Sequence, residues 1–208
     1  MEKSLEDREN AKMRELVTRE LEESAAVKRE IAQHLSDVIA KAARLILEAY
    51  KVGGRVLLIG NGGSAADAQH IAAELVGRFK LERVGLLAMA LTTNTSILTA
   101  LANDYGYDSI FSRQLEVLAT ERDVLIAITT SGTSPNILKG VEMAHSKGAT
   151  VIGLTGAKSS RLKDIADLTI AVPSDNTARI QEAHITIGHI ICYLVEKWLF
   201  HESSGISR

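Results

Sequence analysis

The sequence predicts an α/β fold in which a five-stranded parallel sheet is covered by helices and preceded by an N-terminal helical arm. Five short segments are continuously apolar rather than alternating, which indicates strands buried on both faces. Helical patterns lie between these segments, and such alternation is typical of βαβ units. The predicted strands are 55–60, 86–91, 123–129, 150–155 and 168–172.

The arm is expected as a helix from about Glu6 to Tyr50, because apolar residues recur there at steps of three and four. Gly53 and Gly54 provide its stop signal. The first ~15 residues are polar, so we expect them to fray or to pack only on a partner subunit. A chain of 208 residues suits a single domain over 1–208, of which 1–50 form the arm.

Helices are also expected between and after the strands. Their ranges are 64–80, about 108–119, 134–147, about 158–166 and about 177–200. The last one is apolar over much of its circumference, which indicates burial under the sheet or in a subunit interface. Two apolar helical segments beside one modest sheet favour association with further copies of the chain.

The composition narrows the class of protein. A net charge of −2 gives no reason to expect a nucleic acid or a membrane surface as partner. The single cysteine, Cys192, cannot form an internal disulfide, which fits a reducing compartment. No apolar run reaches the ~18 residues of a membrane span. We therefore expect a cytoplasmic protein.

Two loops at predicted strand ends are candidates for ligand binding. They are "GNGGS" at 60–64 and "TTSGTSPN" at 129–136, and each leads into a predicted helix. Ligands in open α/β sheets bind at the carboxyl ends of strands, and a helix N-terminus favours an anion. Such residues also make ordinary turns and N-caps, but two such loops favour a phosphate. Neither loop contains lysine, so we expect a small phosphomonoester rather than a nucleoside triphosphate.

Polar side chains on two predicted helices are candidates for metal binding or proton transfer. His70 and Glu74 are four residues apart and share one helix face, as in an ordinary surface pair, an acid–base pair or a metal site. Gln181 and His189 are separated by ~12 Å along the last helix, which strains the idea that both bind one metal. For His184 we favour a hydrogen-bonded or solvent-facing histidine over a ligand. Spacing alone leaves a metal as one possibility.

Four motifs carry a resemblance to a known family. They are "GNGGSAADAQHIAAEL", "LTALANDYGY", "TTSGTSPNIL" and "RIQEAHITIGHI". In this order and spacing they closely resemble the bacterial phosphoheptose isomerases of the sugar isomerase (SIS) domain superfamily. The resemblance implies a flavodoxin-like three-layer sandwich, a homotetramer and one zinc ion per subunit.

The resemblance also implies an activity. The family interconverts D-sedoheptulose 7-phosphate and D-glycero-D-manno-heptose 7-phosphate by base-catalysed proton transfer through an enediol(ate). This reaction begins the synthesis of ADP- or GDP-heptose for the lipopolysaccharide core or other surface glycans.

The family's site residues transfer onto matching positions of this chain. By resemblance Glu74 is the catalytic base and His189 the acid. The implied metal ligands are His70, Glu74, Gln181 and His189. The implied substrate-binding residues are Asn61, Gly62, Gly63, Glu74, Asn103, Asp104, Thr129, Thr130, Ser131, Ser134 and Gln181.

Departures from the family and alternative functions bear on this assignment. Thr129 and Thr130 stand where many members have serine, and Ala178 stands where some have aspartate. Close relatives are non-catalytic tetramers that bind the replication initiator protein and replace residues at the positions of Glu74 and His189. This chain keeps both, which favours the isomerase. An isomerase or sensor of another sugar phosphate is the second alternative.

Overall fold

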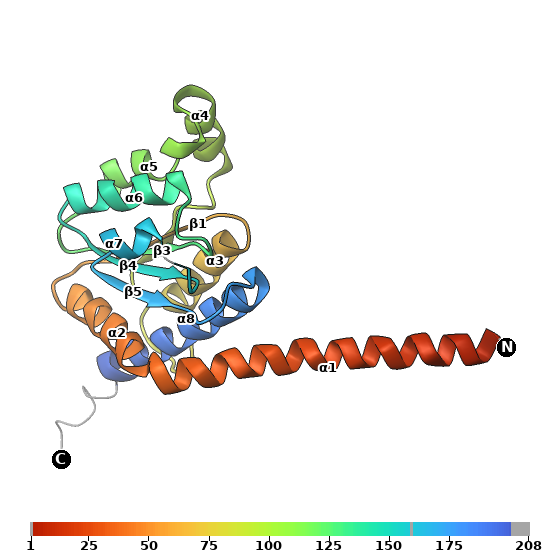
Figure 1. The fold of residues 1–208 in the computed structure, drawn as a ribbon. Coiled ribbons are helices and arrows are strands. Elements are labelled where there is room, and N and C mark those ends of the chain that lie inside the picture. The colour runs from red at the N-terminus through yellow and green to blue at the C-terminus, as the bar shows by residue number, and fades with distance from the viewer. Residues whose placement is uncertain (1, 159, 201–208) are drawn as a thin grey trace, which may run out of the picture.

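The computed structural model describes residues 2–158 and 160–200 and contains the expected five-stranded parallel sheet (Figure 1). The strand order is β2-β1-β3-β4-β5, the flavodoxin-like order. The strands are β1 (Val56–Gly60), β2 (Ala88–Ala90), β3 (Val124–Ile128), β4 (Thr150–Thr155) and β5 (Leu168–Ala171). Each lies within a segment predicted from the sequence.

Helices surround the sheet and account for most of the remaining chain. They are α1 (Glu2–His34), α2 (Ser36–Lys51), α3 (Gly63–Val76), α4 (Thr95–Tyr105), α5 (Ser112–Leu118), α6 (Pro135–Ser146), α7 (Arg161–Ile165) and α8 (Thr177–Phe200). A 3₁₀ turn, η1 (Tyr107–Ser109), precedes α5. None of the described helices is long and apolar enough to cross a membrane.

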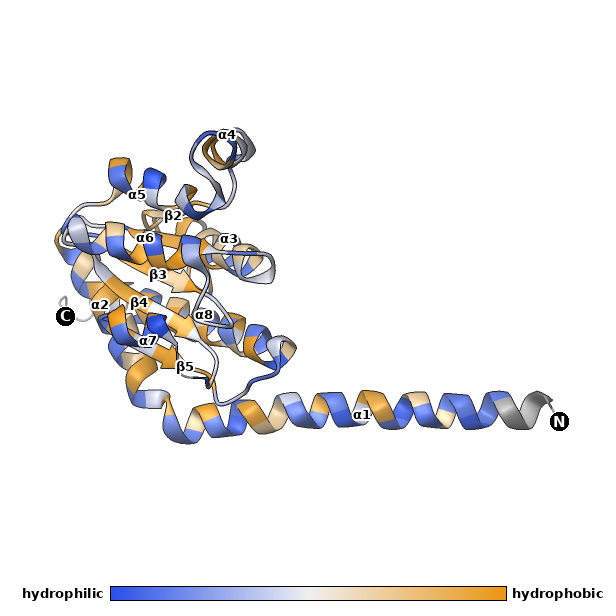
Figure 2. Ribbon diagram, turned by 45° about the horizontal axis from the view of Figure 1, so that its top comes forward, coloured by the Kyte–Doolittle hydropathy of each residue, from blue (hydrophilic) through white to orange (hydrophobic). Residues whose placement is uncertain are grey.

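The sheet separates two hydrophobic cores, which makes the fold a three-layer sandwich (Figure 1). On one face Leu58 and Ile126 meet the apolar sides of α2, α3 and α8. On the other face Leu57 and Leu125 meet α5, α6 and α7. Successive strand residues therefore serve opposite cores, which explains why the strands read as continuously apolar (Figure 2).

The N-terminal arm differs from the single helix expected over Glu6–Tyr50. Leu35 leaves helical geometry (φ −116°, ψ 2°) and separates α1 from α2. The Ser36 hydroxyl donates to the carbonyl of Ala32 at 2.7 Å, a local bond that bends helices. After this bend α2 packs on the sheet, whereas α1 projects far beyond the body of the protomer (Figure 1).

Two further helix predictions were wrong. No helix was expected over α4, although Asn94 caps it by accepting a hydrogen bond from the backbone N–H of Ile97 at 3.0 Å. None of the residues of α4 is fully buried, but Leu98, Leu101 and Ala102 form a helical stripe that packs partly on the core, so the sequence signal was present and was overlooked. The helix expected over 108–119 is divided into η1 and α5, because the chain turns at Ile110 and Phe111 to bury both side chains.

A buried ion pair ties the loop after α3 to α8. The side chains of Arg83 and Glu196 are 2% and 1% exposed, with Nε 3.2 Å from Oε1. Arg83 also donates to the carbonyls of Leu75 (2.8 Å) and Glu74 (2.9 Å) at the end of α3. Glu196 accepts from the backbone N–H of Lys80 at 2.7 Å. The pair therefore joins the C-terminal end of α3 to α8.

Replacing the carboxylate of this pair is expected to change both stability and its pH dependence. Burial alone would raise the pKa of Glu196, but backbone hydrogen bonds and the charge of Arg83 together hold the pKa below the usual range of a glutamate. A lowered carboxyl pKa adds stability above the unfolded value, which is lost as the pH falls through the folded value. Glu196→Gln leaves Arg83 buried and uncompensated, at a cost of about 3 kcal/mol or more.

Chemical denaturation of both proteins at one fixed concentration, between pH 7 and pH 3, measures these effects. The wild type is expected to lose more stability than Glu196→Gln as the pH falls through the acidic range. Equal stabilities at pH 7, or identical pH slopes, would contradict the role of the pair.

Candidate active site

Two loops meet at the carboxyl end of the sheet because β1 and β3 are neighbours in register. Gly60 at the end of β1 pairs with Ile128 at the end of β3. The side-chain amides of Asn61 and Asn136 then join the loops through two reciprocal hydrogen bonds of 2.9 and 2.8 Å. Sequence reasoning missed Asn136, which is 2% exposed and is the link between the two loops.

Hydroxyl groups gather in the loop that leads into α6. Thr129 Oγ1 lies 3.1 Å from Ser134 Oγ and 3.4 Å from Ser131 Oγ. Gly132 has φ +67° and lies so close to Ser160 that a Cβ there would be 2.1 Å from the Ser160 hydroxyl oxygen. Only glycine fits this turn, which keeps the hydroxyls at the N-terminus of α6, where an anion is favoured.

A cavity of about 280 Å³ opens beside the hydroxyl loop. Thr130 and Ser131 line it, as does Lys158 from the loop after β4. The glycine loop (60–64) and the hydroxyl loop (129–136) contain no lysine, but the fold brings one to the cavity from a third loop. Lys158 is therefore a candidate counter-charge for a phosphate. Sequence reasoning missed this lysine, because its only sequence signal is its place after a predicted strand.

Three of the predicted metal-ligating and catalytic side chains meet between α3 and α8. His70 Nε2 lies 3.1 Å from Glu74 Oε1 and 3.1 Å from His189 Nε2. The candidate ligand atoms of all three residues lie within 4.8 Å of one another. The His70 side chain is 48% exposed and the Glu74 side chain 23%, so the group is open to solvent in the protomer.

Close packing of the two helices produces this meeting. A Cβ on Gly188 would lie 2.6 Å from Cδ1 of Ile71, so the glycine lets α3 approach α8 closely. The ring of Phe79 stacks on His189 with centroids 5.4 Å apart and fixes the imidazole from one side. Neither Gly188 nor Phe79 was singled out from the sequence.

The donor set fits a zinc ion. Two imidazoles and one carboxylate are ligands that zinc accepts, and their close approach brings three donors to one point. Three protein ligands with a further position open to substrate are typical of catalytic rather than structural zinc sites. His70, Glu74 and His189 are therefore the residues that would hold such an ion.

Gln181 lies elsewhere on α8. Its side chain contacts the start of α3, where a Cβ on Gly63 would be 2.5 Å from Nε2 of Gln181. This placement brings Gln181 to the glycine loop, near the residues predicted to bind substrate. Its assignment as a fourth metal ligand remains a prediction.

Asn103 and Asp104 are placed on α4, which projects from the body of the protomer (Figure 1). Both are exposed, and the Asn103 amide donates to Asp104 Oδ1 at 2.8 Å. Their contact with a substrate remains a prediction.

Two further titratable groups lie near the site. His184 is fully buried, Nε2 donates to the carbonyl of Thr155 at 3.3 Å, and burial lowers its pKa to about 4. It is thus a hydrogen-bonded core histidine, one of the two alternatives expected.

Asp67 lies one turn before His70 on α3. Burial raises the pKa of its carboxyl group to about 6, and the charge of His70 opposes this shift only in part.

Zinc added to metal-free protein is expected to raise its melting temperature through His70. Binding at 100 times Kd adds about 2.7 kcal/mol to the free energy of unfolding. His70→Ala should lose this shift. His145→Ala is the matched control, because His145 likewise lies 3.1 Å from a carboxylate, that of Asp167, but outside the site. Calorimetry at equal zinc concentration decides, and equal shifts in both variants would contradict the assignment.

Comparison with known proteins places the chain in a family. The SIS domain model matches residues 21–156. The phosphoheptose isomerase of Geobacter metallireducens is 52% identical over 188 residues, covering 90% of this chain and 100% of that protein. That of Aquifex aeolicus is 54% identical over 191 residues, covering 92% and 100%.

Solved structures agree with the sequence comparisons. The phosphoheptose isomerase of Neisseria gonorrhoeae superposes with a TM-score of 0.85 at 41% identity, covering 89% of this chain and 99% of that one. That of Francisella tularensis also gives a TM-score of 0.85, at 40% identity over 88% and 97%. The chain therefore belongs to the phosphoheptose isomerase family of SIS domain proteins.

Proposed function

We propose that this protein is an aldose–ketose isomerase that interconverts D-sedoheptulose 7-phosphate and D-glycero-D-manno-heptose 7-phosphate. The observation that carries the proposal is the meeting of His70, Glu74 and His189 in a member of the phosphoheptose isomerase family. The hydroxyl loop at the N-terminus of α6 supplies a place for the phosphate.

The reaction moves two protons, and the site offers a group for each. Glu74 takes the proton from C1 of the ketose and returns it to C2, while His189 gives a proton to the oxygen on C2 and accepts the one from O1. A carboxylate has two oxygens, so Glu74 can face His70 with Oε1, at 3.1 Å, and take the proton with Oε2. No atoms are gained or lost, as isomerisation requires.

A zinc ion held by His70, Glu74 and His189 would supply positive charge where negative charge develops on the substrate oxygens. Gln181 is proposed to share in binding both metal and sugar. The phosphate, held by Thr129, Thr130, Ser131 and Ser134 with Asn61–Gly63 beside them, fixes the far end of the sugar and so positions C1 and C2.

The quaternary state and cellular role belong to the same proposal. We expect a homotetramer from the resemblance to the family, and the arm and the groups at His70 and at Asn103 and Asp104 are exposed in the protomer, as surfaces that a further subunit could cover. A second subunit that covers them would complete the site. The product would enter ADP- or GDP-heptose synthesis for lipopolysaccharide core or other surface glycans, in the cytoplasm.

Removing the proposed base should separate catalysis from binding. Glu74→Gln is expected to lower kcat by about 10²- to 10⁴-fold, the usual contribution of a positioned base, with KM changed much less. Glu82→Gln is the control, because Glu82 follows α3, its side chain is 92% exposed, and it forms an exposed ion pair with Arg78. Steady-state kinetics with sedoheptulose 7-phosphate measure both. Near-wild-type turnover of Glu74→Gln would rule out its role as base.

The two alternatives are tested directly. A non-catalytic scaffold would bind the replication initiator protein in a pull-down and show no isomerisation. Retention of Glu74 and His189 in one cluster speaks against it. NMR screening of C5 to C7 ketose phosphates tests substrate choice, and faster turnover of another ketose would displace the heptulose as substrate.

A further inference from the structure

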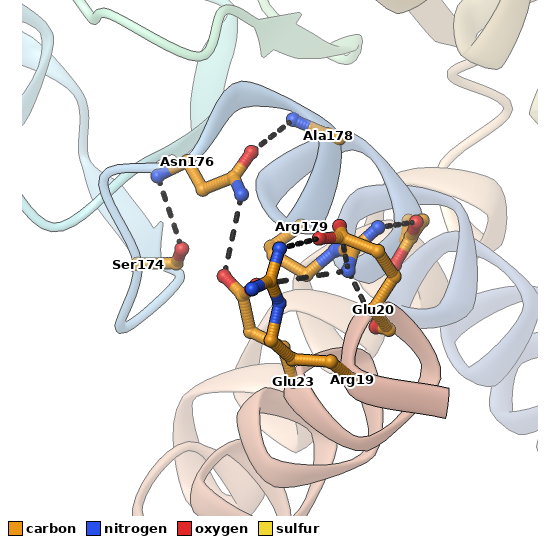
Figure 3. A network of polar contacts seen from close by, with 8 residues as sticks. Arg19, Glu20, Glu23, Ser174, Asn176, Ala178 and Arg179 are labelled. Carbon is orange, nitrogen blue, oxygen red and sulfur yellow. Dashed lines mark hydrogen bonds and ion pairs between the residues drawn. The ribbon is translucent and has the colours of Figure 1, made fainter. Parts of the chain in front are cut away.

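A buried arginine joins the arm to the first turn of α8 (Figure 3). Arg179 is 7% exposed, and its Nη1 donates to the backbone carbonyl of Glu20 at 2.5 Å and to the carboxylate of Glu20 at 3.2 Å. Its Nη2 donates to Glu182 Oε1 at 2.6 Å. A planar guanidinium suits this arrangement, because it binds several acceptors at once in fixed directions.

A second contact ties the same region to the arm. The side-chain amide of Asn176 donates to Glu23 Oε1 at 3.2 Å, while its oxygen accepts from the backbone N–H of Ala178 at 3.0 Å (Figure 3). The second of these bonds satisfies an N–H of the first turn of α8, which helical bonds leave free. Glu23 and Glu20, one turn apart on α1, therefore hold the start of α8 at two points.

The opposite side of this turn belongs to the candidate site. Gln181 follows Arg179 by two residues and so points about 200° around the helix from it. There its amide contacts Gly63 of the glycine loop. Thr177 and Ile180, from the same turn, line the cavity beside the hydroxyl loop. The first turn of α8 is thus held between the arm and the predicted substrate-binding residues.

We propose that Arg179 is a positioning residue, which uses Glu20 of the arm and Glu182 to keep Gln181 against the glycine loop. The inference rests on the proposed function and deepens it, because it gives the arm a part in substrate binding. Loss of the guanidinium removes bonds to both Glu20 and Glu182 and leaves their carboxylates to repel each other. The turn then moves, and Gln181 on its far side moves with it.

Hydrogen exchange tests the positioning without reference to activity. In Arg179→Met, amides of residues 177–183 and 60–64 should exchange about tenfold faster, as expected when local opening costs about 1.4 kcal/mol less. Arg161→Met is the control, since Arg161 makes an exposed ion pair with Glu142 on another face of the sheet. Unchanged exchange at 60–64 in Arg179→Met would overturn the proposal. Glu20→Ala, a milder change in the exposed partner, should give the same pattern with smaller amplitude.

A double-mutant cycle tests the route through Gln181. Arg179→Met is expected to raise KM for sedoheptulose 7-phosphate about tenfold with a smaller change in kcat, because it misplaces a binding group rather than the base. If Arg179 acts through Gln181, the double variant Arg179→Met/Gln181→Ala loses no more kcat/KM than Gln181→Ala alone. Additive losses would overturn the proposal.

The proposed isomerase activity and the proposed positioning role of Arg179 are contradicted by different results. If the wild-type holoenzyme does not isomerise the heptulose phosphate, the proposed function fails. The exchange comparison of wild type, Arg179→Met and Arg161→Met then decides by itself whether Arg179 holds the glycine loop through α8.

Discussion

The contact between α3 and α8 is the constraint on which the candidate site depends, because each helix carries only part of it. His70 and Glu74 belong to α3 and His189 to α8, 119 residues from His70 in sequence. Gly188 permits the close approach, and the buried Arg83–Glu196 pair holds it by binding the last carbonyls of α3. Two charges are expensive to bury, but here each is paired and further hydrogen-bonded, so removing either would destabilise the contact between the helices.

The fold assigns different tasks to different parts of the molecule. The neighbouring ends of β1 and β3 place the glycine and hydroxyl loops side by side, where the N-terminus of α6 favours a phosphate. The helices α3 and α8 bring together His70, Glu74 and His189, the groups proposed for proton transfer and metal binding. A phosphate bound at the hydroxyl loop would restrict the position of the reacting carbons of the sugar. The arm acts on the same site from outside, through Arg179.

Local patterns predicted the parts of the structure that depend on local physics. Buried strands can be recognised in the sequence because both of their faces are apolar. The hydroxyl loop can be recognised because its hydroxyl-bearing residues are close together in sequence. The spacing of His70 and Glu74 indicated one helix face, but only the family resemblance linked it to His189. Asn136 and Glu196 were missed because their partners, Asn61 and Arg83, are 75 and 113 residues away. The helix α4 was missed although Leu98, Leu101 and Ala102 have the spacing of one helix face, so in this case a local signal was overlooked.

The central claim is that His70, Glu74 and His189 hold one zinc ion at the place where the sugar is isomerised. A crystal structure of the zinc-loaded protein with a heptulose phosphate bound, with anomalous data collected on both sides of the zinc absorption edge, tests it directly. We predict one anomalous peak per subunit, within bonding distance of both imidazoles and the Glu74 carboxylate, with C1 and C2 of the sugar beside Glu74 and the phosphate at the hydroxyl loop. A peak at other residues, or a sugar bound away from Glu74, would contradict this account.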